Sequence, residues 1–441
     1  MKAIAFAAAL AVGCGDPAPR TGDLEIVGHH DVVVRGMNSA LAIAGTTAYV
    51  GSRIDGKGVI IFDIADPTNP QLVGEIGPPD EGVAGMSSRE LRAVDDLNLL
   101  VVLNLQCSPT LHGCAMGAAE PENLKFYDIT DRVHPRLVST VEFPGTVIAK
   151  PSPHELFLWR DPADPSRVLV YVAAPGPSAL WILDVTNPAM PTQLLRWDPI
   201  KMGGLPSGGQ DNILHSVSVS PDGRTGYLSH QTAGLAVVDL STIADRGTPA
   251  VTMVTPPANA LTFGVMGPHS AVEVPDRPLL FVTEEVYPAP FGAGCPWGHA
   301  RLVDITDPTT PATTGEFALP ENDPGCAFDG AMTAFTAHNA TVTKNLAFVT
   351  WYAGGLQALD ISDPANPRQL AELRPEPLSQ VSVEDPGLGG SPIEMWSYPV
   401  IQDGIIWVVD VRNGLYAIRY TGAFEDEVTS LHFAEGNSNL Q

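Results

Sequence analysis

Residues 355–367 read Gly355-Leu-Gln-Ala-Leu-Asp360-Ile-Ser-Asp363-Pro364-Ala-Asn-Pro367, and similar stretches recur along the chain. Each stretch opens with a short apolar run, which is typical of a buried strand. An aspartate ends the run, and short polar side chains follow it at a spacing that lets them accept hydrogen bonds from the backbone of a turn. The prolines fix φ and stop the strand. Another apolar run comes next, so each copy predicts a strand, a rigid corner and an antiparallel return strand.

The aspartate that ends the apolar run recurs every 55–65 residues. The copies place it at Asp63, Asp128, Asp184, Asp239, Asp304 and Asp360, with Arg419 in the seventh place. A regular period with only strand content favours a propeller or another repeat array. Two further strand patterns lie upstream of each copy. We therefore predict an all-β, seven-bladed β-propeller with four antiparallel strands per blade.

The two ends of the chain predict how the ring closes. Residues 24–30 match the return strands but have no corner before them, whereas the seventh copy has no return strand after Tyr420. We expect the N-terminal strand to complete the last blade, which removes free sheet edges. Residues 23–421 then form the propeller, and residues 422–441 are expected to be a loose acidic tail.

The first 22 residues have the pattern of an export signal. Met1-Lys2 precedes an apolar run that is too short to span a bilayer. The run ends in Ala11-Val12-Gly13-Cys14, which resembles a bacterial lipobox. This predicts a signal peptide at 1–13, acylation of Cys14, a tether at 14–22, and an outer-membrane lipoprotein of the bacterial envelope. Plain secretion is the alternative.

Charge and missing motifs exclude several classes of function. The formal net charge is −26, which disfavours binding to nucleic acid. The nucleophile motif Gly-x-Ser-x-Gly, the zinc motif His-Glu-x-x-His, the phosphate-binding loop and the EF-hand pattern are all absent. The commonest serine hydrolases, zinc proteases and nucleotide enzymes are therefore disfavoured. We expect a monomer.

Four cysteines besides Cys14 predict disulfides in an exported chain. They are Cys107, Cys114, Cys295 and Cys326. Three pairings are possible. We favour Cys107–Cys114, which are close in sequence, and Cys295–Cys326, which fall in adjacent loops of the fifth blade.

Four histidines occupy the same repeat position in consecutive blades, at the predicted start of the innermost strand. They are His154, His215, His269 and His338. These strand starts surround one mouth of the central channel. The second strand of each blade ends nearby, and it contributes the further candidates Arg53, His230, Glu284, Glu285 and Tyr352, with His299 in an adjoining loop. Glu284 and Glu285 alternate across a strand, so at most one of them faces the mouth.

Imidazoles that converge with a carboxylate suit a transition metal such as Cu, Zn or Fe, or a histidine general base. The alternative is that a structural histidine was copied with each repeat. The other three blades carry Asn38, Arg89 and Trp396 at this position. Folding of the repeat therefore does not require histidine there.

The Asp-Ile-Ser/Thr-Asp-Pro corner resembles that of the LVIVD-repeat family of bacterial β-propeller proteins, over nearly the whole predicted mature chain. A more distant similarity of architecture links the chain to the copper-dependent selenium-binding and methanethiol oxidase propellers. Propellers host many unrelated functions. We expect an envelope lipoprotein that binds a partner protein or a small-molecule ligand at its channel mouth. The alternative is a metal-dependent oxidase or hydrolase.

Overall fold

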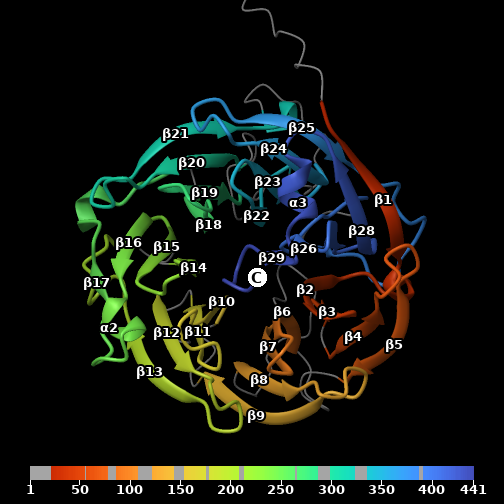
Figure 1. Cartoon of the computed structure of the whole chain (residues 1–441), viewed down its shortest axis with the longest axis horizontal. Coiled ribbons are helices and arrows are strands. Elements are labelled where there is room, and N and C mark those ends of the chain that lie inside the picture. Colours follow the sequence, from red (N-terminus) through yellow and green to blue (C-terminus); the bar gives the residue numbers. More distant parts are fainter. Residues whose placement is uncertain are drawn as a thin grey trace, which may run out of the picture.

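The computed structural model describes most of the chain, and Figure 1 shows it as a ring of sheets around a central axis. The described residues are 21–54, 56–77, 86–107, 122–143, 153–174, 178–207, 213–263, 266–286, 298–322, 335–386 and 391–441. Strands dominate these residues, and none of their helices is long and apolar enough to cross a membrane. The predicted β-propeller is therefore confirmed as the architecture.

Most sheets are four-stranded units in which consecutive strands pair antiparallel, as β10 to β13 do. Three of these units are β10 (Glu155–Arg160), β11 (Val168–Ala174), β12 (Ala179–Asp184), β13 (Thr192–Trp197); β14 (Ile213–Val219), β15 (Thr225–Gln231), β16 (Gly234–Asp239), β17 (Thr252–Met253); and β18 (Pro268–Glu273), β19 (Leu279–Glu284), β20 (Ala300–Asp304), β21 (Ala312–Phe317). A fourth is β22 (Ala340–Val342), β23 (Leu346–Thr350), β24 (Leu356–Asp360), β25 (Arg368–Leu373). In each unit the first strand lies nearest the axis (Figure 1).

Two sheets are larger. An eight-stranded sheet contains β2 (Asn38–Ala44), β3 (Thr47–Ser52), β4 (Val59–Asp63), β5 (Gln71–Ile76), β6 (Met86–Val94), β7 (Leu99–Gln106), β8 (Glu122–Asp128) and β9 (Arg136–Phe143). A single residue pair, Ser52 with Ser88, joins its two halves. A five-stranded sheet contains β1 (Asp23–His30), β26 (Val400–Gln402), β27 (Ile405–Asp410), β28 (Gly414–Thr421) and β29 (Phe433–Glu435). Short helices are α2 (Ser241–Ala244) and α3 (Glu425–Thr429).

The N-terminal strand closes the ring as the sequence predicts. β1 pairs antiparallel with β28, from Asp23 opposite Thr421 to His30 opposite Leu415. We call the end of the ring at Asp23 the corner end, because the anchoring aspartates lie there. We call the other end the histidine end. Pairing of the N-terminal strand with β28 joins the first part of the chain to the last sheet and so closes the ring.

The aspartate corners have the predicted turn chemistry. In each of six copies, the aspartate that ends the third strand accepts a hydrogen bond from the backbone amide two residues on, at 2.7–3.0 Å. The six are Asp63, Asp128, Asp184, Asp239, Asp304 and Asp360. The corner also contacts the preceding blade: the hydroxyl of Ser139 donates to the carbonyl oxygen of Pro188 at 2.5 Å, and that of Thr255 to Pro308 at 2.7 Å. The corners therefore fasten neighbouring blades together.

The hydrophobic core lies between neighbouring sheets rather than inside one sheet. One buried cluster joins Val101 and Phe126 of the β6–β9 half-sheet to Leu158 and Val170 of the next. Equivalent clusters lie between the following sheets. The alternating aliphatic residues of each strand thus bury both faces, which explains the near-continuous apolar runs in the sequence.

The C-terminal residues correct one expectation. Residues 422–441 are not a loose tail, because they form α3 and then β29, which pairs antiparallel with β26 on its axial edge. The chain then crosses the ring: Leu158 donates its amide to the carbonyl oxygen of Asn437 at 3.1 Å, and Ser438 forms a bridge with Leu158. Figure 1 shows the C-terminus near the ring centre. The contacts of this segment with β26 and with β10 are non-local, so local composition could not reveal them.

Candidate metal centre

The four repeat histidines lie together at the centre of the ring, and we call them the histidine cluster. His215 and His269 are bulge residues: the register of β14 shifts between Leu214 and Ser216, and that of β18 between Pro268 and Ser270. A bulge re-aims one side chain relative to the strict alternation of a strand. The inner strands therefore direct these imidazoles toward the axis, where both are buried.

The imidazole rings of the cluster contact one another in sequence order. The ring centroids are 4.4 Å apart for His154 and His215, 4.0 Å for His215 and His269, and 4.4 Å for His269 and His338. Trp396 continues the row at 5.0 Å from His338. Four consecutive blades thus present one continuous arc of imidazoles.

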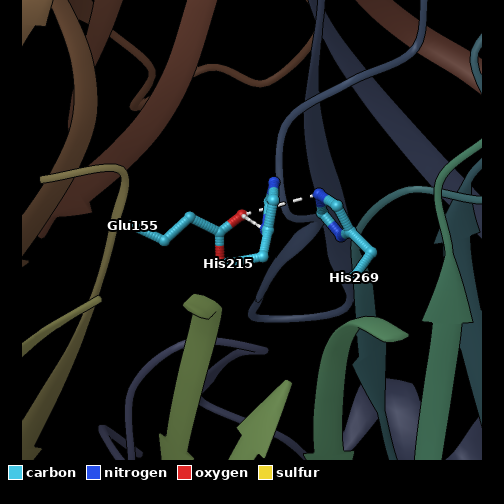
Figure 2. Close-up of side chains that lie close together, drawn as sticks. All are labelled: Glu155, His215 and His269. Carbon is cyan, nitrogen blue, oxygen red and sulfur yellow. Dashed lines mark ion pairs between the residues drawn. The ribbon is translucent and has the colours of Figure 1, made fainter. Parts of the chain in front are cut away.

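Two buried carboxylates, Glu155 and Glu285, face this arc. Glu155 Oε1 lies 3.8 Å from His215 Nδ1 and 3.7 Å from His269 Nε2 (Figure 2). Glu285 Oε2 lies 3.4 Å from His269 Nε2, and its Oε1 lies 3.4 Å from His338 Nε2. The hydroxyl of Tyr352 donates to Glu285 Oε1 at 2.5 Å, which orients that carboxylate.

These side chains form two overlapping sets with the spacing of metal ligands. The sets are Glu155, His215, His269 and His269, Glu285, His338, and within each set the ligand atoms lie within 4.8 Å of one another. Nitrogen and oxygen ligands bind Zn²⁺ at ~2.0–2.2 Å, so the ligand atoms of a tetrahedral site lie ~3.4 Å apart. The carboxylate–imidazole separations of 3.4–3.8 Å are close to this spacing.

The tautomer of His338 is fixed by a backbone contact. Its Nδ1 lies 2.6 Å from the carbonyl oxygen of Trp396, which can only accept, so Nδ1 carries the proton. The lone pair of Nε2 is then left facing Glu285. Histidines that bind metals usually donate their other N–H to a carbonyl or carboxylate in this way.

Burial also keeps the imidazoles unprotonated. It lowers the pKa of His215, His269 and His338 well below the usual range, and neighbouring histidines lower the pKa of each further. The carboxyl of Glu155 has a pKa raised well above its usual range, first by burial and then by Glu90. Neutral imidazoles are the form that binds metals.

The structure separates the other predicted site residues into two groups. Arg53 and Tyr352 lie beside the cluster: Arg53 pairs with Asp385 at 3.6 Å and stacks over Trp396, and Tyr352 contacts Glu285. His154 contacts His215 but is in neither ligand set. Three further candidates make their printed contacts away from the cluster. Glu284 pairs with Arg301, His230 bonds to Ser178 and to the carbonyl of Gln231, and His299 lies near Glu316. Of the Glu284–Glu285 pair, only Glu285 faces the cluster.

Sequence reasoning missed Glu155. It directly follows His154, and strict alternation would place the two side chains on opposite faces of a strand. A signal was available, because His154-Glu155 stands at the repeat position where the next three blades carry histidine.

Most of the cysteines on which the disulfide and acylation predictions rest lie outside the described residues. Cys107 is disulfide-bonded. Cys14, Cys114, Cys295 and Cys326 lie outside the described ranges, so the pairing and the acylation of Cys14 stay predictions.

One comparison with known proteins bears on the repeat. The family model of the LVIVD repeat matches residues 35–76 and 336–371, so the fold and the repeat together define a β-propeller that carries LVIVD repeats. A crystal structure of a protein from Lactobacillus plantarum is similar with a TM-score of 0.49 and 12% sequence identity, over 76% of this chain and 86% of that chain. No curated protein matches the sequence.

Proposed function

We propose that this LVIVD-repeat propeller is a binding module whose ligand is a transition-metal ion held at the ring centre. One observation carries the proposal: two buried ligand sets share His269, and every member is an imidazole or a carboxylate. Buried polar atoms normally have hydrogen-bond partners. Within the described residues, His215 Nδ1 and His269 Nδ1 make no hydrogen bond. A bound ion would compensate the burial of this polar cluster.

The donor set limits the kind of ion. Imidazole suits Zn, Cu and Fe, whereas Mg and Ca prefer sites made only of oxygen ligands. We propose Zn, Cu or Fe. His215, His269, His338 and Glu285 are the primary ligands of this proposal, and Glu155 is an alternative oxygen donor.

The proposal includes the finer organisation of the protein. The single Ser52–Ser88 link supports counting the eight-stranded sheet as two blades, which gives seven blades in total. The Ala11-Val12-Gly13-Cys14 motif supports export and lipid anchoring of a monomer in the bacterial envelope. The loops at the histidine end would then bind an envelope protein or a small molecule.

A metal-dependent oxidase or hydrolase is the second candidate. It is favoured by the position of His269 Nε2 between two carboxylates, 3.7 Å from Glu155 and 3.4 Å from Glu285. One carboxylate could bind the ion while the other transfers a proton to or from a substrate. An activity that appears with metal and disappears on its removal would favour the enzyme.

Elemental analysis of the purified full chain tests the metal site. We expect about one transition-metal ion per chain in the wild type and loss of that ion in the His215→Ala/His269→Ala double variant. The matched control is His299→Asn, which changes a half-buried histidine outside both ligand sets and should keep the ion. A wild type that binds no ion after incubation with Zn²⁺, Cu²⁺ or Fe²⁺, with melting unchanged in the double variant, would contradict the proposal.

A further inference from the structure

Arg89 occupies the same structural position as the cluster histidines. It is the bulge residue of β6, where the register shifts between Ser88 and Glu90, as it does at His215 and His269 in their strands. Its side chain is only 8% exposed. The bulge that directs the histidines to the axis therefore places a guanidinium group at the ring centre.

Contacts connect Arg89 to the histidine cluster through Trp396. The guanidinium carbon of Arg89 lies 5.5 Å from the Trp396 ring centroid, and that of Arg53 lies 5.3 Å from it. The His338 ring lies 5.0 Å from the same indole. The last imidazole of the arc and two buried cations thus contact the same indole.

The positive charge of Arg89 acts on the imidazoles of the histidine cluster. Arg89 contributes to lowering the pKa of both His215 and His338, after burial and other larger causes. Arg53 pairs with Asp385, and Arg92 pairs with Glu90 at 3.2 Å. The two sides of the ring centre therefore differ: imidazoles lie on one side and guanidinium groups on the other.

The difference between the imidazole side and the guanidinium side determines which groups would surround a ligand bound to the metal. An ion held by histidines of consecutive blades would lie on their side of the ring, and Arg89 and Arg53 from the other blades would then be near its remaining coordination position. Zn²⁺ binds carboxylate oxygen well, and the guanidinium fork matches a carboxylate in geometry and charge. We propose that Arg89, assisted by Arg53, forms a carboxylate-binding subsite beside the metal, so that the exchangeable metal ligand is a small carboxylate. This inference rests on the proposed metal site.

The test uses the full chain loaded with Co²⁺, whose visible absorption reports a change of ligand. Acetate is the probe, and acetamide is its neutral isostere. We expect acetate to shift the Co²⁺ bands of the wild type and acetamide to leave them unchanged at the same concentration. Arg89→Gln should weaken acetate binding by about tenfold or more, because it removes a charge-assisted hydrogen bond. Arg89→Lys, which keeps the charge without the fork, should give an intermediate loss.

The outcomes distinguish the subsite from the metal site. Spectra are compared per bound Co²⁺, so a variant that loses metal is not mistaken for one that loses acetate. Equal acetate affinity in the wild type, Arg89→Gln and Arg89→Lys would overturn the subsite, as would equal effects of acetate and acetamide. If Arg89→Gln does not fold, the comparison of Arg89→Lys with the wild type decides. Failure of the wild type to bind Co²⁺ would reject the proposed function itself.

Discussion

The Nδ1 atom of His338 donates a hydrogen bond to the backbone carbonyl oxygen of Trp396 at 2.6 Å. The two residues belong to consecutive repeats, so the packing of one blade on the next sets the tautomer of an imidazole at the ring centre. Because the acceptor is a backbone atom, substitutions of the Trp396 side chain leave it in place. The Nε2 lone pair of His338 remains directed at Glu285.

Replacing His338 by glutamine should lower metal affinity at least about tenfold, because it removes an Nε2 donor from the set that contains Glu285. Isothermal titration with Zn²⁺ measures the effect. His230→Gln is the matched control, since His230 is equally buried but bonds to Ser178 and Gln231 outside the ligand sets. Equal affinity in the two variants would contradict the assignment of His338.

Tyr352→Phe should weaken metal binding by about 10–100-fold, because partners that orient a ligand have effects of this size. The change removes the hydroxyl that donates to Glu285. Its cost in folding free energy should be about 1 kcal/mol, the usual net value of one hydrogen bond. Zn²⁺ titration and denaturant unfolding of the same variant separate the two effects. A large loss of stability with unchanged metal affinity would show a purely structural role.

Gly436→Ala should destabilise the protein by about 1–3 kcal/mol, the range for overpacking. Gly436 lies in the segment that crosses the ring, and a Cβ added there would collide with the carbonyl oxygen of Ala340 in β22. Gly77→Ala is the control, because no atom lies within 4 Å of the position of its added Cβ. Equal melting temperatures of the two variants would show that residues 433–441 are not packed as described.

The stability of the corners should depend on pH in the acidic range. Hydrogen bonds from the Thr130 hydroxyl and amide, and from Arg136, lower the pKa of Asp128 from 3.8 to about 2. A carboxyl with a lowered folded-state pKa stabilises the fold above its unfolded pKa, and this contribution is lost as the pH falls toward 2. The melting temperature of the wild type should therefore exceed that of Asp128→Asn at pH 5, and the difference should shrink toward pH 2. A difference that does not vary with pH would contradict this cause.

Much of the fold could be predicted because the decisive interactions are local. The hydrogen bond from Thr130 to Asp128 spans two residues, and such contacts follow directly from sequence spacing. The arc of histidines could be predicted from the repeat, because equivalent positions in a ring are neighbours. Glu155 was missed because strict alternation places neighbouring side chains of a strand on opposite faces, whereas His154 and Glu155 both contact His215. The pairing of β29 with β26 was missed because it joins segments without a shared motif.

The position of β1 has a consequence for how the protein would sit on a membrane. Asp23 lies at the corner end of the ring, and the histidine cluster lies toward the opposite end. Cys14 lies nine positions before Asp23, and an extended chain of that length spans at most about 30 Å. A lipid on Cys14 would therefore hold the ring close to the bilayer by its corner end. The histidine end of the ring would then point away from the lipid surface, toward the aqueous compartment.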